Sequence, residues 1–179
     1  MAERTQSRLW LMRLIFVAVC LLIMFLHLLP LDTSPRSWAG PDLILALACA
    51  WVVRRPEFVP VTLIALVFVL TDLLYQMPPG LWAAFVVIGT ETLRSRAPSL
   101  RDLTFPAEWF TVAVTLTLMT LGNQLTLALF LVDRPPLWLN LMQLVMTLVA
   151  YPLVAFGSQF LFGVRKQAPG DVDALANRR

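Results

Sequence analysis

The chain has 179 residues, of which 59% are hydrophobic and 14% are charged, and its mean hydropathy is +0.76. Soluble domains carry about 45–50% apolar and about 25% charged residues, so the composition excludes a soluble domain and predicts an integral membrane protein. The net charge of +3 does not indicate nucleic-acid binding, because the basic residues flank apolar segments and form no stripe interleaved with exposed aromatic residues.

Six apolar segments follow one another with short polar connections. We expect each to be a membrane-spanning helix, since about 20 apolar residues cross the hydrocarbon core of a bilayer. The expected spans are 9–29, 41–53, 58–74, 79–93, 107–132 and 137–164. The fold class is therefore an all-α polytopic membrane protein, with one domain at 1–166. The polar tail at 167–179 is too short to pack and is expected to be disordered.

The second segment is the shortest. Pro41 and Asp42 open it, where a missing N–H has no cost and the helix dipole favours a carboxylate. Its 13 apolar residues would reach only about 20 Å, against a core of about 30 Å. This helix is therefore short, shielded by its neighbours, or extended through Trp38.

The third and fourth segments end in charged residues. Asp72 lies near the outer end of the third, and a Met-Pro-Pro-Gly turn follows at 77–80. The fourth ends at Glu91 and Arg94, which are within i,i+3 reach of each other. A basic inner loop is expected from Arg94 to residue 101.

The last two segments carry uncharged polar residues. The fifth begins with Pro106 and Glu108, an ordinary helix start. Pro152 should kink the sixth. The sixth also has a polar face that should point into the bundle, because polar side chains seek partners away from lipid. This face consists of Asn140, Gln143, Thr147, Tyr151 and Ser158.

The basic residues predict the orientation. Twelve of the fourteen lie at one set of helix ends, and only Arg36 and Arg134 lie at the other. Lys and Arg are retained on the cytoplasmic side during insertion. We therefore expect a bacterial inner-membrane protein with both termini in the cytoplasm and contacts with membrane lipids. Cys20 and Cys49 lie inside the spans and should be free thiols.

Polar residues gather in the expected outer half of the bundle. One interpretation is a ligand- or partner-binding site that opens outward. The other is a set of interhelical hydrogen bonds and helix caps, which explains Asp42 best. Asp72 is harder to explain in this way, because desolvation without a partner is costly. The candidates are Asp42, Asp72, Asn123, Gln124, Asn140 and Gln143, with His27 at the same depth.

The sequence contains no pattern typical of an enzyme or a cofactor site. His27 is the only histidine and has no cysteine or carboxylate run beside it to complete a metal site. No Ser–His–Asp set can be assembled, and no Gly-rich phosphate loop is present. We expect a non-enzyme without a cofactor.

Three short stretches place polar residues at the ends of apolar helices. They are Pro-Asp-Leu at 41–43 with Trp51 and Arg-Arg-Pro at 54–56, Leu-Thr-Asp-Leu-Leu at 70–74 with Pro-Gly-Leu at 79–81, and Glu-Thr-Leu-Arg at 91–94. Together with the six-span layout, they resemble the MreD family of rod shape-determining proteins. That family often has a glycine one turn before the third-helix Asp, where this chain has Phe68 and Val69.

The resemblance implies a role without a reaction. MreD-like proteins are non-catalytic scaffolds of the bacterial elongation (Rod) complex, which regulates cell shape and lateral peptidoglycan synthesis. The implied partners are a bitopic MreC-like protein, a RodA-like glycosyltransferase with its class B penicillin-binding transpeptidase, and MreB filaments. The family is also similar in fold to the substrate-binding subunits of energy-coupling-factor transporters. The alternative function is therefore a substrate-binding subunit of a vitamin-type transporter, with Asp72, Asn123 and Asn140 at its ligand site.

Overall fold

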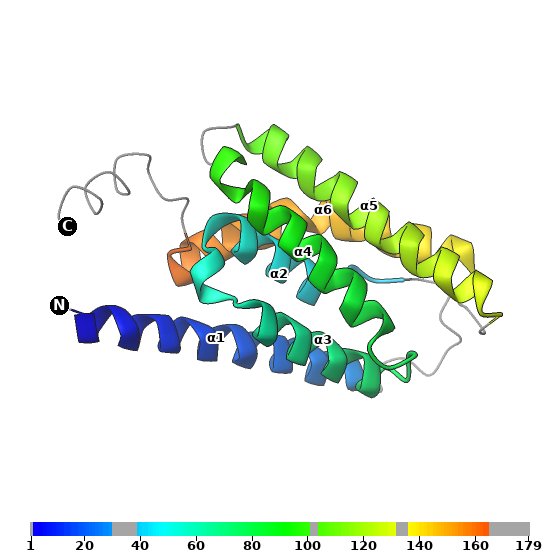
Figure 1. Ribbon diagram of the computed structural model, residues 1–179, viewed down its shortest axis with the longest axis horizontal. Coiled ribbons are helices and arrows are strands. Elements are labelled where there is room, and N and C mark those ends of the chain that lie inside the picture. Colours follow the sequence, from blue (N-terminus) through cyan, green and yellow to red (C-terminus); the bar gives the residue numbers. More distant parts are fainter. Residues whose placement is uncertain (1, 30–38, 101–103, 132–135, 165–179) are drawn as a thin grey trace.

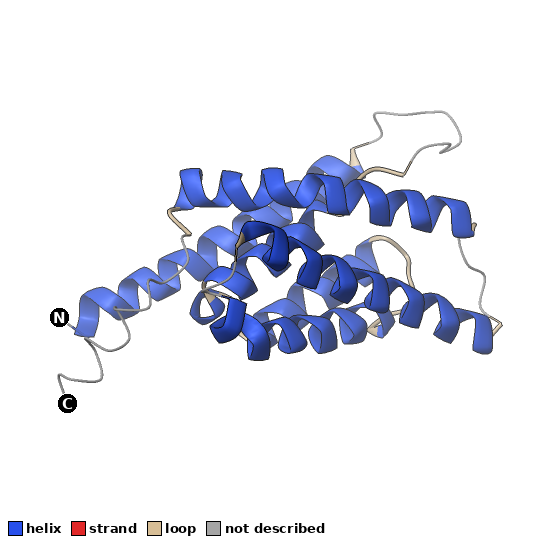
Figure 2. Cartoon of the chain, turned by 90° about the horizontal axis from the view of Figure 1, so that it is seen from above, coloured by secondary structure: helices blue, strands red, loops and turns tan. Residues whose placement is uncertain are grey.

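The protein is all-helical in the computed structural model, which describes residues 2–29, 39–100, 104–131 and 136–164. Figure 2 shows only helices and loops within these ranges, and the long helices run along the long axis of the molecule. The expected tail at 167–179 and Trp38 lie outside the described residues. The elements are α1 (Ala2–Leu28), α2 (Leu43–Arg54), the 3-10 helix η1 (Pro56–Phe58), α3 (Val61–Leu74), α4 (Leu81–Leu100), α5 (Phe105–Leu129) and α6 (Leu137–Phe162).

Three helices are long and apolar enough to cross a membrane, namely Gln6–Leu28 of α1, α5 and α6. These three helices indicate a membrane protein. α2 and α3 are apolar but shorter, at 12 and 14 residues. α4 has 20 residues, and its second half carries Glu91, Arg94 and Arg96. Six complete spans remain a prediction.

The short helix α2 lies at the centre of the bundle (Figure 1). Eleven of its twelve residues are buried, and it packs chiefly on α6 and α4. A helix that is apolar on all sides has no face suited to water and is stable only when enclosed. Of the three explanations for its length, the structure supports shielding by neighbours, because residues 39–42 are not helical. At 1.5 Å per residue the helix is about 18 Å long.

The basic loop expected after residue 93 is wrong for residues 94–100, which continue α4 to Leu100. Leu93, Ala97 and Leu100 are buried and fall four and three residues apart on one helical face. Burial of this apolar face explains why the helix continues past Arg94 and includes Pro98. Residue 101 lies outside the described ranges.

α4 and α5 approach each other closely at two glycines. A Cβ on Gly89 would collide with the side chain of Met119, and a Cβ on Gly122 would lie 2.6 Å from the Phe85 ring. Small residues allow membrane helices to pack at short range. This contact holds α4 against α5 and so fixes the positions of the polar residues that both helices carry.

Candidate functional site

Asp72 joins α3 to α4. Its Oδ2 accepts hydrogen bonds from the backbone N–H groups of Gly80, at 2.9 Å, and Ala83, at 3.2 Å. Gly80 precedes α4 and has a positive φ of 83°, a conformation that favours glycine. Asp72 therefore supplies the capping oxygen that Gly80, which has no side chain, cannot provide. The side chain is fully buried.

The turn between these two helices is ordered by backbone bonds. The Gln76 N–H donates to the Leu73 carbonyl at 3.4 Å, and the Met77 N–H donates to the Asp72 carbonyl at 2.9 Å. Gln76 has a φ of 56°. This pattern is a Schellman motif with glutamine in the left-handed position that glycine usually occupies.

Asp42 caps α2 and ties it to α6. Its Oδ1 accepts from the Leu45 N–H at 2.9 Å, and its own N–H donates to Thr147 Oγ1 at 2.9 Å. These contacts agree with the expected helix-start role. Of the predicted inward face of α6, Thr147, Tyr151 and Ser158 are buried, whereas Asn140 and Gln143 are half-buried.

The six polar candidates do not form one cluster. Asn123, Gln124 and Asn140 line a single cavity of about 390 Å³ between the α3–α4 turn, α5 and α6. Asp42, Asp72 and Gln143 do not line it. Its other polar and aromatic lining residues are Tyr75, Gln76 and Trp82. The Tyr75 ring lies 4.7 Å from the His27 ring, between centroids.

Two amide groups of the cavity residues have an unsatisfied oxygen. Asn123 Oδ1 and Gln124 Oε1 are buried and accept no hydrogen bond from the described part of the chain. Gln124 is 9% exposed. A buried polar atom without a partner is uncommon, because the desolvation of that atom is not compensated.

The α2–α3 connection and α4 are linked through Arg94. Its Nε lies 2.7 Å from Glu91 Oε1, the i,i+3 contact that the spacing predicts. Its Nη1 and Nη2 donate to the carbonyls of Pro56, at 2.8 Å, and Val59, at 2.6 Å. The guanidinium thus holds the connection between α2 and α3 against α4.

A second network, centred on Arg54 and Glu108, was not predicted. Arg54 Nε lies 3.4 Å from Glu108 Oε1, and the Tyr151 hydroxyl donates to the same oxygen at 3.0 Å. Arg54 Nη1 also donates to the Ala155 carbonyl at 2.7 Å. The Arg54 and Glu108 side chains are 4% and 0% exposed. The network joins α2, α5 and α6 inside the bundle.

A proline inside α6 leaves one backbone carbonyl of that helix without its donor, and a side chain of α5 supplies the missing hydrogen bond. Pro152 has no N–H, so the Leu148 carbonyl, four residues earlier, lacks its helical donor. The Trp109 indole Nε1–H donates to that carbonyl at 3.0 Å. The indole therefore substitutes for the missing backbone group.

Comparisons with known proteins add no assignment. No protein-family model, no curated protein and no solved structure matches the chain. Within the described ranges, no group of three or more His, Cys, Asp or Glu residues could hold a metal ion. Among the described residues, the geometry offers a set of interhelical ties and a cavity lined by amides.

Proposed function

We propose that this protein is a non-catalytic membrane scaffold of the bacterial elongation complex, and that it regulates cell shape and lateral peptidoglycan synthesis by contact. The proposal starts from the resemblance to the MreD family over residues 41–96. The expected partners are an MreC-like bitopic protein, a RodA-like glycosyltransferase and a class B penicillin-binding transpeptidase. Through them the protein would be connected to MreB filaments.

The observation that carries the proposal is the set of contacts that the charged residues of the three stretches make within the chain. Asp42 caps α2, Asp72 caps α4, and the Glu91–Arg94 pair holds the α2–α3 connection. Each charge is directed at another part of the same chain. Charged residues that are used as an internal framework suit a protein that presents a defined helical surface to partners.

The outer surface of the bundle supports the same proposal. Large apolar side chains are exposed along the three longest helices, for example Leu14 on α1, Leu125 on α5 and Leu153 on α6, which are 63%, 73% and 75% exposed. In a membrane such faces contact lipid or other helices, and association then depends on close packing. We place the protein in the inner membrane with both termini in the cytoplasm.

Gentle crosslinking in native membranes tests this function. The chain would be purified through a C-terminal tag, and the proteins recovered with it would be identified by mass spectrometry. An unrelated small membrane protein with the same tag is the control. We expect an MreC-like protein with wall-synthesis enzymes. Recovery of ATPase subunits and a coupling membrane protein in their place would overturn the scaffold proposal and support the transport subunit.

The transport alternative has one specific observation in its favour. Asn123 and Asn140, two of the three residues proposed for the ligand site of such a subunit, line one cavity together with Gln124, although Asp72 does not line it. A subunit of this kind would need an energised partner.

A further inference from the structure

We propose that Arg13, where α1 meets η1, binds the phosphate of an anionic phospholipid headgroup, and that Arg8 is the second cation of this site. The site does not rest on the scaffold function. A scaffold and a transport subunit would both meet such a lipid in the membrane.

The charge balance at this end of the bundle singles out Arg13. Each carboxylate among the side chains described there already has an arginine partner. The pairs are Arg54–Glu108, Arg55–Glu57 and Arg94–Glu91. Arg8, Arg13 and Arg96 have no carboxylate within ion-pair distance in the described part of the chain. Arg8 and Arg96 are exposed, whereas Arg13 is half-buried. A cation that is partly desolvated without a counter-ion is unfavourable, so Arg13 is the position that calls for an external anion.

The contacts of Arg13 fix its guanidinium and leave one edge open. Nη2 donates to the Glu57 carbonyl at 3.4 Å, and the guanidinium carbon lies 5.4 Å from the centroid of the Trp10 ring. Nε is buried and cannot reach a ligand. Nη1 is not buried and donates to no described residue, so it remains available to an anion. Hydrogen bonds from a guanidinium to a phosphate are charge-assisted and about twice as strong as neutral ones.

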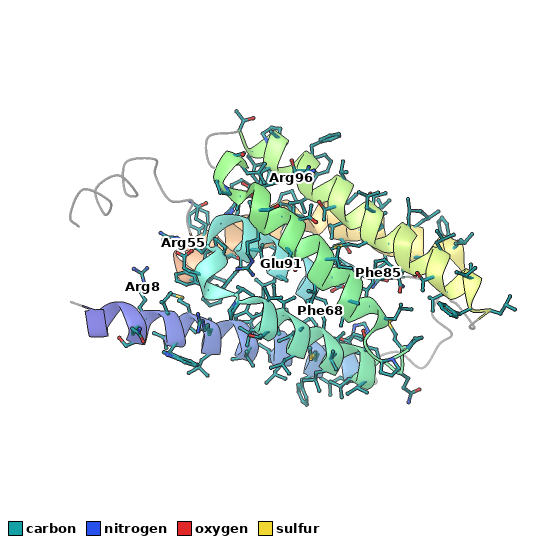
Figure 3. The ribbon with its side chains drawn as sticks, in the orientation of Figure 1. Arg8, Arg55, Phe68, Phe85, Glu91 and Arg96 are labelled. Atoms are coloured by element: carbon teal, nitrogen blue, oxygen red, sulfur yellow. The ribbon has the colours of Figure 1, made fainter. Side chains whose placement is uncertain are left out.

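Arg8 adds a second positive charge close to this edge. It lies about 7.5 Å from Arg13 along the α1 axis, at 1.5 Å per residue. Its side chain is exposed and extends from α1 toward the part of the bundle that carries Arg55 (Figure 3). Glu57 is the carboxylate beside the site, and its Oε1 lies 3.3 Å from Arg55 Nη1, which offsets its charge. The surroundings of Arg13 are therefore positive.

The apolar surface next to Arg13 favours a lipid over free phosphate. Trp10, Leu14 and Leu21 are exposed and follow one another at offsets of 4 and 7, so they form one edge of α1. In a bilayer, Trp10 suits the interface and the leucines contact acyl chains. A phospholipid can place its phosphate at Arg13 and its acyl chain along this edge. Inorganic phosphate offers only the first contact.

The test uses the full chain in a neutral detergent, with bound lipid counted by native mass spectrometry. Phosphatidylglycerol is the anionic probe, and phosphatidylcholine, which has the same phosphodiester without net charge, is the zwitterionic probe. Inorganic phosphate is added as a competitor. We expect saturable binding of phosphatidylglycerol, binding of phosphatidylcholine that is weaker by about fivefold or more, and no displacement by equimolar inorganic phosphate.

Substitutions locate the binding. Arg13→Gln should weaken phosphatidylglycerol binding by about fivefold, the contribution of one cation near a membrane surface. Arg13→Lys keeps the charge but not the planar fork and should bind with intermediate affinity. Arg96→Gln makes the same change in net charge at the same end, on α4, and should bind as the wild type does. Arg8→Gln, at an exposed side chain, should also weaken binding and replaces Arg13→Gln if that variant does not fold.

Equal weakening by Arg13→Gln and Arg96→Gln would overturn the proposal, because the lipid would then respond to the overall charge of this end. Phosphatidylcholine binding as tightly as phosphatidylglycerol, or displacement of the lipid by equimolar inorganic phosphate, would overturn it as well. So would wild-type affinity in whichever of Arg13→Gln and Arg8→Gln folds.

Discussion

Asp72 and Glu108 are both fully buried carboxylates, yet their partners differ. Asp72 faces two backbone N–H groups at the start of α4, whereas Glu108 faces a guanidinium and a phenol. Asp72 therefore acts as a cap, and removing it exposes unsatisfied donors. Glu108 compensates a buried positive charge, so removing it leaves an ion without a counter-ion.

We expect Asp72→Ala to lower the free energy of unfolding by about 1–3 kcal/mol, because the Gly80 and Ala83 N–H groups lose their acceptor. Asp72→Asn keeps one side-chain oxygen and should lose less. Reversible unfolding in mixed micelles measures both. Equal stability of Asp72→Ala and the wild type would show that the cap contributes nothing.

For Glu108→Ala we expect a larger loss of about 3–5 kcal/mol, because Arg54 is then buried unpaired. The double variant Arg54→Met with Glu108→Leu removes both charges and should recover most of that loss. The same unfolding assay compares the variants. If the double variant is as unstable as Glu108→Ala, lost packing and not the unpaired charge is responsible.

At the scale of elements, α6 and α5 are coupled through a single backbone carbonyl. Trp109→Phe removes the indole donor to Leu148 and should cost about 0.5–1.5 kcal/mol. In a Pro152→Ala background the residue 152 N–H can serve that carbonyl, so the same substitution should cost much less. A double-mutant cycle measures this coupling. An identical cost in both backgrounds would show that the indole does not replace the missing backbone N–H.

The order and helical character of the elements could be predicted, because apolar segments bounded by Pro, Gly and charges are a local signal. The cap by Asp42 was predictable for the same reason. The Arg54–Glu108 pair could not be predicted, because each residue alone is explained by its place in the sequence. Arg54 is one of the basic residues at a helix end that predict the membrane orientation, and Glu108 belongs to an ordinary helix start. Only the packing of α2 and α5 on α6 brings these residues together, 54 positions apart. The inward face of α6 that carries Tyr151 was the available signal.

At the scale of the whole molecule, the basic residues lie toward one end of the bundle. Among the described side chains, Arg8, Arg55 and Arg96 lie toward the end of the bundle where α1 begins, whereas Phe85 lies toward the other end (Figure 3). Arg13 is tied to the same end by its contact with the Glu57 carbonyl at 3.4 Å. Asp42 and Asp72 lie at helix ends away from these cations. The bundle thus carries the asymmetry that directs membrane insertion.

This asymmetry predicts the sidedness of two exposed positions. Cys20 and Cys49 are buried and should react little with a maleimide, so single cysteines can be introduced with a low background. In intact cells a membrane-impermeant maleimide should label Met77→Cys, at the α3–α4 turn, from the periplasm. Ser95→Cys, on the basic end of α4, should be labelled only after permeabilisation. The unsubstituted chain is the control. The reverse pattern would contradict the orientation that the basic residues predict, because it would place the basic end of the bundle on the periplasmic side.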